Sequence, residues 1–270
     1  MGKLEKILQE NAAFLQDVTN MVSKVLSDLK MESNQEIIAY HPLTNGHMLR
    51  PLLVYITAGS FEKEISKEKR EKLVYFAAAV ELMHNASLLH DDLLDSEEMR
   101  RGKPCLYKQY GFKNGLLAGN IFYIKAIELS NQFLEVEQTK DLLDSAITMC
   151  EGELLQAKYE NQIIPAEIYD QIIRFKTGAL TALACRQAAN ILCSEERVTY
   201  LFGKFGEELG VMYQLRDDRK DQDANVEKQF DFNEQIEACN DKVLSYMEEL
   251  AKTKKIEQFE EIIAYFKKSE

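Results

Sequence analysis

The sequence predicts an all-α fold, and three observations support that prediction. Turn-forming residues are scarce, because the 270 residues include only 12 glycines and 4 prolines and neither type occurs after Gly210. Apolar residues make up 46% of the chain, enough for a sizeable core. They recur every three or four residues, as on one face of a helix. Because sheets need more frequent turns, we expect one domain over residues 1–270 with about ten helices.

The first helices are predicted from apolar spacing and from turn residues. Apolar residues from Leu4 to Leu29 form one stripe at helical spacing, which indicates one long helix. Ser33 and Glu36 have the spacing of a capping box and predict the start of a short second helix. Residues 42–46 then form a break.

The next helix contains the sequence LRPLLVYITAG, in which Pro51 is tolerated because it lies near the helix start. A long helix over residues 68–98 ends before Gly102 and Pro104, which are stop residues. Further helical patterns cover residues 115–135, 139–160, 166–192, 195–222, 233–252 and 256–268.

Charge and cysteine content narrow the class of protein. The net charge of −12 argues against a nucleic-acid partner, because phosphate backbones require a basic surface. The five cysteines are odd in number and lack zinc-site spacing, which favours the reducing cytoplasm. The N-terminal residues lack the apolar core of a signal peptide, and no run of about 18 apolar residues could span a membrane. We therefore expect a soluble cytoplasmic protein.

An unusual group of carboxylates ends the helix predicted over residues 68–98. In LLHDDLLDSEEMRRGKP (88–104), Asp91 and Asp95 are four residues apart and share a helical face, with Asp92 beside them. A single pattern of this kind would be better explained by a solvated acidic face. Here the flanks are apolar, and a second pattern, YQLRDDRKD (213–221), ends another predicted helix. The repetition favours a functional site over a solvated surface.

The residue types in these two motifs suit a metal–phosphate site. Carboxylate oxygens are ligands for Mg²⁺, which takes one or two carboxylates and completes its shell with water and phosphate oxygens. Arg100 and Arg101 follow the first motif directly, and a guanidinium group matches the geometry of a phosphate. The sequence therefore predicts a site for Mg²⁺ and diphosphate.

With these motifs the sequence resembles the trans-polyprenyl diphosphate synthases, from about residue 43 to about residue 222. Further matching pieces in the same order are GHMLRPLL (46–53), EGELLQ (151–156) and KTGAL (176–180). The resemblance implies a bundle of long helices around a central cavity, usually as a homodimer. It also implies a prenyltransferase that condenses an allylic diphosphate with isopentenyl diphosphate.

The resemblance assigns roles to matching residues. Binding of Mg²⁺ and the allylic diphosphate would fall to Asp91, Asp92, Asp95, Asp217, Asp218 and Asp221. The pocket for isopentenyl diphosphate would contain His47, Arg50, His84 and Arg101. Contacts on the allylic side would come from Arg100, Lys176, Thr177 and Gln214. The catalytic set would be Asp91, Asp92, Asp95, Lys176, Asp217 and Asp218. Product chain length would depend on Ala86 and Ser87, small residues that leave the cavity floor open.

Two departures from the family pattern keep alternatives open. His47 stands where the family usually has a lysine, and a neutral histidine holds phosphate more weakly. Residues 222–235 lack the Gly-Lys loop of the family, so the loop over the diphosphates is missing or rebuilt. The alternatives are a prenyltransferase with another acceptor, such as a peptide, and a weakly catalytic partner subunit of a larger synthase.

Overall fold

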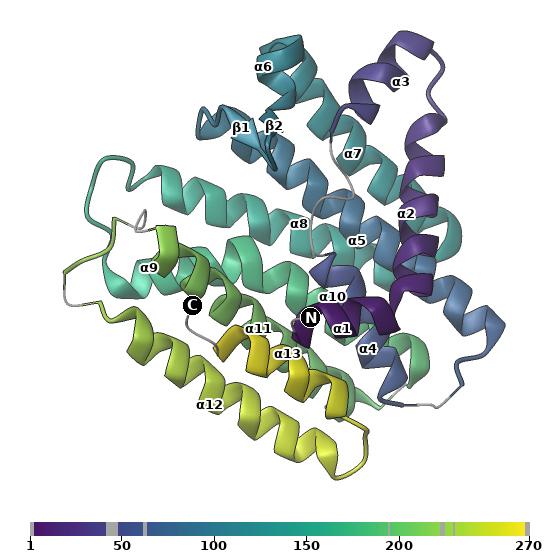
Figure 1. Cartoon of the computed structure of the whole chain (residues 1–270), viewed down its shortest axis with the longest axis vertical. Helices are drawn as coiled ribbons and strands as arrows, with labels where there is room; N and C mark the ends of the chain where they lie inside the picture. The colour runs from purple at the N-terminus through teal and green to yellow at the C-terminus, as the bar shows by residue number, and fades with distance from the viewer. Residues whose placement is uncertain are drawn as a thin grey trace.

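Helix α5 (Lys67–Leu94) has 28 residues and is the longest described helix, with several other helices packed along it (Figure 1). The computed structural model describes residues 3–41, 48–61, 64–193, 195–221, 225–228 and 230–267. The other helices are α1 (Lys3–Glu10), α2 (Ala12–Ser27), α3 (Glu32–Ala39), α4 (Leu49–Gly59), α6 (Leu106–Tyr110), α7 (Phe112–Phe133), α8 (Val136–Ala157), α9 (Ala166–Ile173), α10 (Ala179–Leu192), α11 (Glu196–Asp221), α12 (Phe232–Ala251) and α13 (Glu257–Lys267). The predicted all-α class is confirmed.

Two predictions about the N-terminal helices are wrong. The apolar stripe does not form one helix, because α1 and α2 are separated at Asn11, where ψ is 8°. The buried Asn11 side chain donates a hydrogen bond to the Ile7 carbonyl at 2.7 Å, and such local bonds compete with the helical ladder. The predicted capping box is also absent, since α3 follows Met31 with no side-chain cap.

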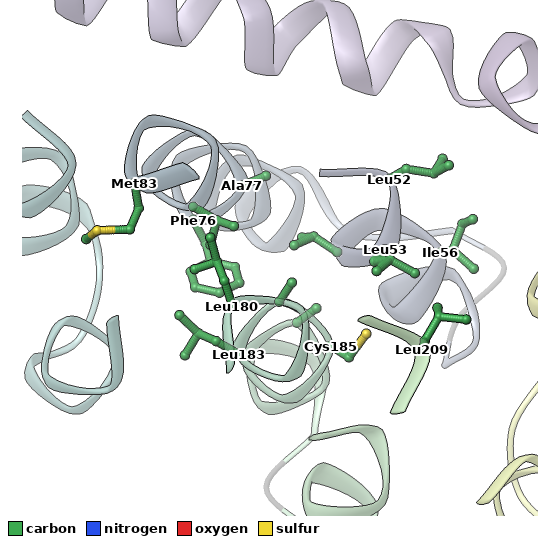
Figure 2. Packing of buried hydrophobic residues seen from close by; sticks show 14 of the residues in the cluster. Leu52, Leu53, Ile56, Phe76, Ala77, Met83, Leu180, Leu183, Cys185 and Leu209 are labelled. Atoms are coloured by element: carbon green, nitrogen blue, oxygen red, sulfur yellow. The ribbon is translucent and has the colours of Figure 1, made fainter. Parts of the chain in front are cut away.

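The hydrophobic core holds the charged end of α5 in place. In Figure 2, Leu53 of α4, Phe76 of α5, Leu183 of α10 and Leu209 of α11 lie around the same interior. Each is at most 2% exposed. The core continues along α5 to Ala86 and Leu89, so the helix that carries Asp91 is held by close packing up to its last turns.

Two local irregularities shape the loops and helices that carry the site. The strands β1 (Met99–Arg100) and β2 (Lys103–Pro104) form a tight antiparallel hairpin. Arg101 and Gly102 form its turn with φ of 51° and 79°, as a type I′ turn requires. Between α9 and α10 the chain forms a π-helical turn, η1 (Arg174–Gly178), where the sequence predicted an uninterrupted helix.

Arg174, the first residue of the π-helical turn, forms ion pairs with α9 and α11. Arg174 donates to Asp170 at 2.7 Å and to the buried Glu208 of α11 at 2.9 Å. Lys242 of α12 contacts the same Glu208 carboxylate at 3.3 Å. Insertions of this kind are frequent at functional sites, and this one carries Lys176 and Thr177.

Within the described part of the chain, we find no helix whose length and hydropathy would let it cross a bilayer.

Candidate functional site

A cavity of about 1280 Å³ lies between α4, α5, the hairpin, α8, the π-helical turn and α11. It brings together most of the residues predicted from sequence, because its lining includes Arg50, His84, Ser87, Asp91, Asp95, Arg100, Arg101, Lys176, Thr177, Gln214, Asp217 and Asp218. Asp92 and Ala86 do not line it. His47 and the side chain of Asp221 lie outside the described parts of the structure. One cavity thus collects residues that are up to 168 positions apart, from Arg50 to Asp218.

The last turn of α5 presents two carboxylates to the cavity. Asp91 lies in the helix, and Asp95 caps it by donating its backbone N–H to the Asp91 carbonyl at 2.9 Å. Burial raises the pKa of Asp91 to about 7, against the opposing charge of Lys176. Burial also raises the pKa of Asp95. Protein groups therefore do not fully compensate the negative charges of Asp91 and Asp95, and a bound cation would stabilise both carboxylates.

Asp92 faces away from the cavity. It is 2% exposed, and its Oδ1 accepts hydrogen bonds from Arg100 Nε at 2.7 Å and Nη2 at 2.5 Å. The Oδ2 atom is buried without a hydrogen-bond partner. Side chains of adjacent helical residues point about 100° apart, which explains why Asp91 lines the cavity and Asp92 does not. Asp91 and Asp95 thus line the cavity and Asp92 does not, while the roles of all three as metal ligands remain predictions.

The pairing with Asp92 also occupies Arg100. Burial alone would lower the pKa of the Arg100 guanidinium, but the hydrogen bond and charge of Asp92 raise it. The thiol of Cys105 lies beside this pair, and burial followed by the Asp92 charge raises its pKa to about 12. Arg100 still lines the cavity, so it can contact a ligand without leaving Asp92.

A second, basic part of the cavity is formed by Arg50, Arg101 and His84. Arg50 Nε is buried and has no hydrogen-bond partner. Burial, then the charges of Arg50 and Arg101, hold the pKa of His84 well below its usual range, so this imidazole is neutral. An unpartnered guanidinium N–H beside a second guanidinium forms a site suited to an anion.

The buried counter-charge of this basic pocket was missed by sequence reasoning. Glu81 is 4% exposed and lines the cavity. Its carboxylate accepts a hydrogen bond from Asn85 Nδ2 at 3.0 Å, and the side-chain oxygen Oδ1 of Asn85 lies 3.0 Å from His41 Nε2. Burial raises the pKa of Glu81, and the charge of Arg50 opposes this. Its position three residues before His84, on the same helical face, was the available clue.

The wall opposite α5 carries the second acidic motif in a hydrogen-bonded chain. Thr177 Oγ1 donates to Gln214 Oε1 at 2.9 Å, and Gln214 Nε2 donates to Asp218 Oδ1 at 2.8 Å. The Tyr169 hydroxyl donates to Asp218 Oδ2. Asp217 lies beside Asp218 on the cavity wall. The predicted neighbours Thr177 and Gln214 are thus connected to the motif, and Tyr169 was not predicted.

Part of the segment after the second acidic motif pairs with Ile164. Ile164 forms an isolated parallel bridge with Val226, with hydrogen bonds from Ile164 N to Asn225 O at 2.8 Å and from Glu227 N to Ile164 O at 3.1 Å. Both Ile164 and Asn225 line the cavity. Asn225 and Val226, which follow the second acidic motif, therefore lie beside Ile164 at the cavity wall.

The arrangement of the carboxylates suits a metal ion whose remaining ligands come from a bound phosphate. Among the described side chains, which exclude that of Asp221, no three His, Cys, Asp or Glu residues come close enough to enclose a metal. Mg²⁺ does not require such a cage, because it is commonly bound by one or two carboxylates together with substrate phosphates. Asp91 with Asp95, and Asp217 with Asp218, offer two such open sets of oxygen ligands.

Comparison with known proteins identifies the family. The chain belongs to the polyprenyl synthetase family, whose model matches residues 32–265. A short chain isoprenyl diphosphate synthase of Methanocaldococcus jannaschii is 29% identical over 208 residues, which cover 74% of this chain and 62% of that protein. A geranylgeranyl diphosphate synthase of Sulfolobus acidocaldarius is 31% identical over 189 residues, which cover 67% of this chain and 56% of that protein.

The fold agrees with this assignment. The crystal structure of a geranyltransferase from Legionella pneumophila matches with a TM-score of 0.82 at 21% identity, covering 97% of each chain. The alignments with the two curated relatives span less than two thirds of their length.

Proposed function

We propose that this protein is a prenyltransferase that condenses an allylic diphosphate with isopentenyl diphosphate and releases a longer trans-polyprenyl diphosphate. The main support is the division of one cavity into two parts. Acidic side chains from α5 and α11 line one part, and the basic pocket of Arg50, Arg101 and His84 lies beside it. Two anionic substrates of different roles need two such sites.

The acidic part would hold the allylic diphosphate. Asp91, Asp95, Asp217 and Asp218 would bind Mg²⁺, and the ion would supply Lewis-acid stabilisation of the leaving diphosphate. Lys176 and Arg100 would contact the phosphate oxygens as the carbon–oxygen bond breaks. The mainly helical walls around the cavity would keep water from the allylic cation.

The basic part would hold isopentenyl diphosphate. Arg50 and Arg101 would bind its phosphates, and the neutral His84 would donate one hydrogen bond from its ring. The double bond would then attack the allylic cation, forming a carbon–carbon bond, and loss of a proton would restore an allylic diphosphate. A pair of partly buried guanidinium groups matches a diphosphate better than a peptide acceptor, so the pocket favours isopentenyl diphosphate.

We further propose that the working form is a homodimer. Leu117 and Ile124 lie seven residues apart on α7 and are 56% and 62% exposed. Ile147 and Leu154 lie seven residues apart on α8 and are 58% and 67% exposed. Exposed apolar side chains repeated on two neighbouring helices favour a protein partner, and a second copy is the simplest one. A cytoplasmic location and a single domain over residues 1–270 remain predictions from the sequence.

The decisive experiment measures products directly. The purified protein would be incubated with Mg²⁺, labelled isopentenyl diphosphate and a series of allylic diphosphates, and the products analysed by mass. We expect label to appear in allylic diphosphates longer than the primer, and to disappear in Asp217→Asn. Binding of both substrates without any condensation would instead support the role of a partner subunit.

A further inference from the structure

Lys176 is paired inside the cavity, although the resemblance assigns it to a phosphate. Its Nζ atom lies 2.5 Å from Glu153 Oε2 and donates a hydrogen bond to Gln156 Oε1 at 2.9 Å. The side chains of Lys176 and Glu153 are only 22% and 24% exposed. All three residues line the cavity. This ion pair is thus within reach of any diphosphate bound there.

The pair is a consequence of how α8 meets the π-helical turn. Gly152 lies against this turn so closely that a Cβ atom would be 2.8 Å from Phe175 Cβ and 2.9 Å from Lys176 Cγ. Only glycine permits this approach, because real Cβ contacts are not that short. The next residue, Glu153, is therefore held beside the lysine, and Gln156 follows about one helical turn later.

Several carboxylates of the cavity share the positive charge of Lys176. It is the strongest favourable charge acting on both Asp91 and Asp95, while Glu153 adds to the negative charge around them. When Lys176 moves to a phosphate, it leaves Glu153 without this partner. A diphosphate must therefore compete with Glu153 for the ammonium group.

We infer that Glu153 is a positioning residue that holds Lys176 in the cavity when no diphosphate is bound and releases it when one binds. The inference rests on the proposed function only in assuming that the cavity takes diphosphate. Gln156 is neutral and can keep its hydrogen bond to Lys176 with or without bound diphosphate. The diphosphate therefore replaces only the Glu153 carboxylate as the partner of Lys176. Glu153 thereby lowers the affinity for diphosphate while keeping its lysine in place.

The test measures binding without turnover. Inorganic pyrophosphate would be titrated into the full-length protein with Mg²⁺, and its dissociation constant measured by calorimetry. We expect Glu153→Gln to bind pyrophosphate about fivefold more tightly, as loss of one partly buried competing ion pair implies. The matched control is Glu160→Gln, which removes one negative charge from an exposed residue at the same cavity and should change the constant less than about twofold.

Repeating the Glu153→Gln substitution in a variant without Lys176 distinguishes release of the lysine from simple repulsion between Glu153 and pyrophosphate. In Lys176→Met, the Glu153→Gln substitution should no longer tighten binding, because there is no ammonium group to release. An equal gain in both backgrounds would overturn the inference, and so would unchanged, weaker or undetectable binding by Glu153→Gln. These outcomes do not depend on product formation, so a lack of condensation activity would overturn the proposed function and leave this inference standing.

Discussion

Substitution of Ser87 by phenylalanine should shorten the products. Ser87 lines the cavity and lies four residues before Asp91, which is about 6 Å along the helix axis and about 40° around it. A phenylalanine ring at this position would stand in the path of a prenyl chain that grows away from the diphosphate. Because the ring would enter existing space, we expect little loss of stability.

Ala86, which the sequence analysis grouped with Ser87, provides the matched comparison. It lies five residues before Asp91, about 140° around the helix, and it is fully buried without lining the cavity. Leu82 and Met83, the next large residues toward the start of α5, are also fully buried and do not line the cavity. A phenylalanine at position 86 would overpack the core at a cost of about 1–3 kcal/mol. Each kcal/mol lowers Tm by about 2–4 °C in a chain of roughly this size.

The assay compares product mass profiles at fixed substrate ratios with thermal unfolding of both variants. Ser87→Phe should shift the profile to shorter products at nearly unchanged Tm, whereas Ala86→Phe should lower Tm by several degrees. If Ala86→Phe shortens the products at normal Tm and Ser87→Phe does not, the assignment of cavity and core faces on α5 is wrong.

Three further predictions concern metal binding, stability and assembly. Asp91→Asn should lower the condensation rate by orders of magnitude while the circular dichroism spectrum stays unchanged. A near-normal rate would refute the proposal that Asp91 binds the metal ion. Glu208→Gln should lower the free energy of unfolding by about 3 kcal/mol in urea titrations, because it breaks a buried pair; the more exposed Glu207→Gln is the control. Burial alone would raise the pKa of Glu208, but its cationic partners lower it below its ordinary value. The stabilisation by this ion pair should therefore be present above about pH 4.5 and be lost as the pH falls. If Glu208→Gln loses stability on acidification in the same way as the wild type, the prediction is wrong. Ile124→Lys should dissociate the proposed dimer in sedimentation experiments, and an effect equal to that of Leu244→Lys on α12 would argue against the α7–α8 interface.

Much of the fold could be predicted from the sequence because helices depend on local spacing. The predicted helix LRPLLVYITAG is α4 as observed, and the long helix with the first acidic motif ends at Leu94 before the stop residues. The prediction failed where one polar side chain competes with the backbone, as at Asn11, and where tertiary ion pairs stabilise a π-helical turn, as at Arg174. Neither feature changes apolar spacing, so spacing could not reveal them.

The sequence by itself also determined which residue types meet in the site, since two acidic motifs and a pair of arginines appear in it directly. Only the tertiary structure decided which of them face the cavity. Asp92 is turned to Arg100, and Lys176 is held by Glu153, a residue more than twenty positions away in the chain. The physical reason is that a charge buried between helices takes whichever partner packing brings within hydrogen-bond distance, and that choice depends on contacts far apart in sequence.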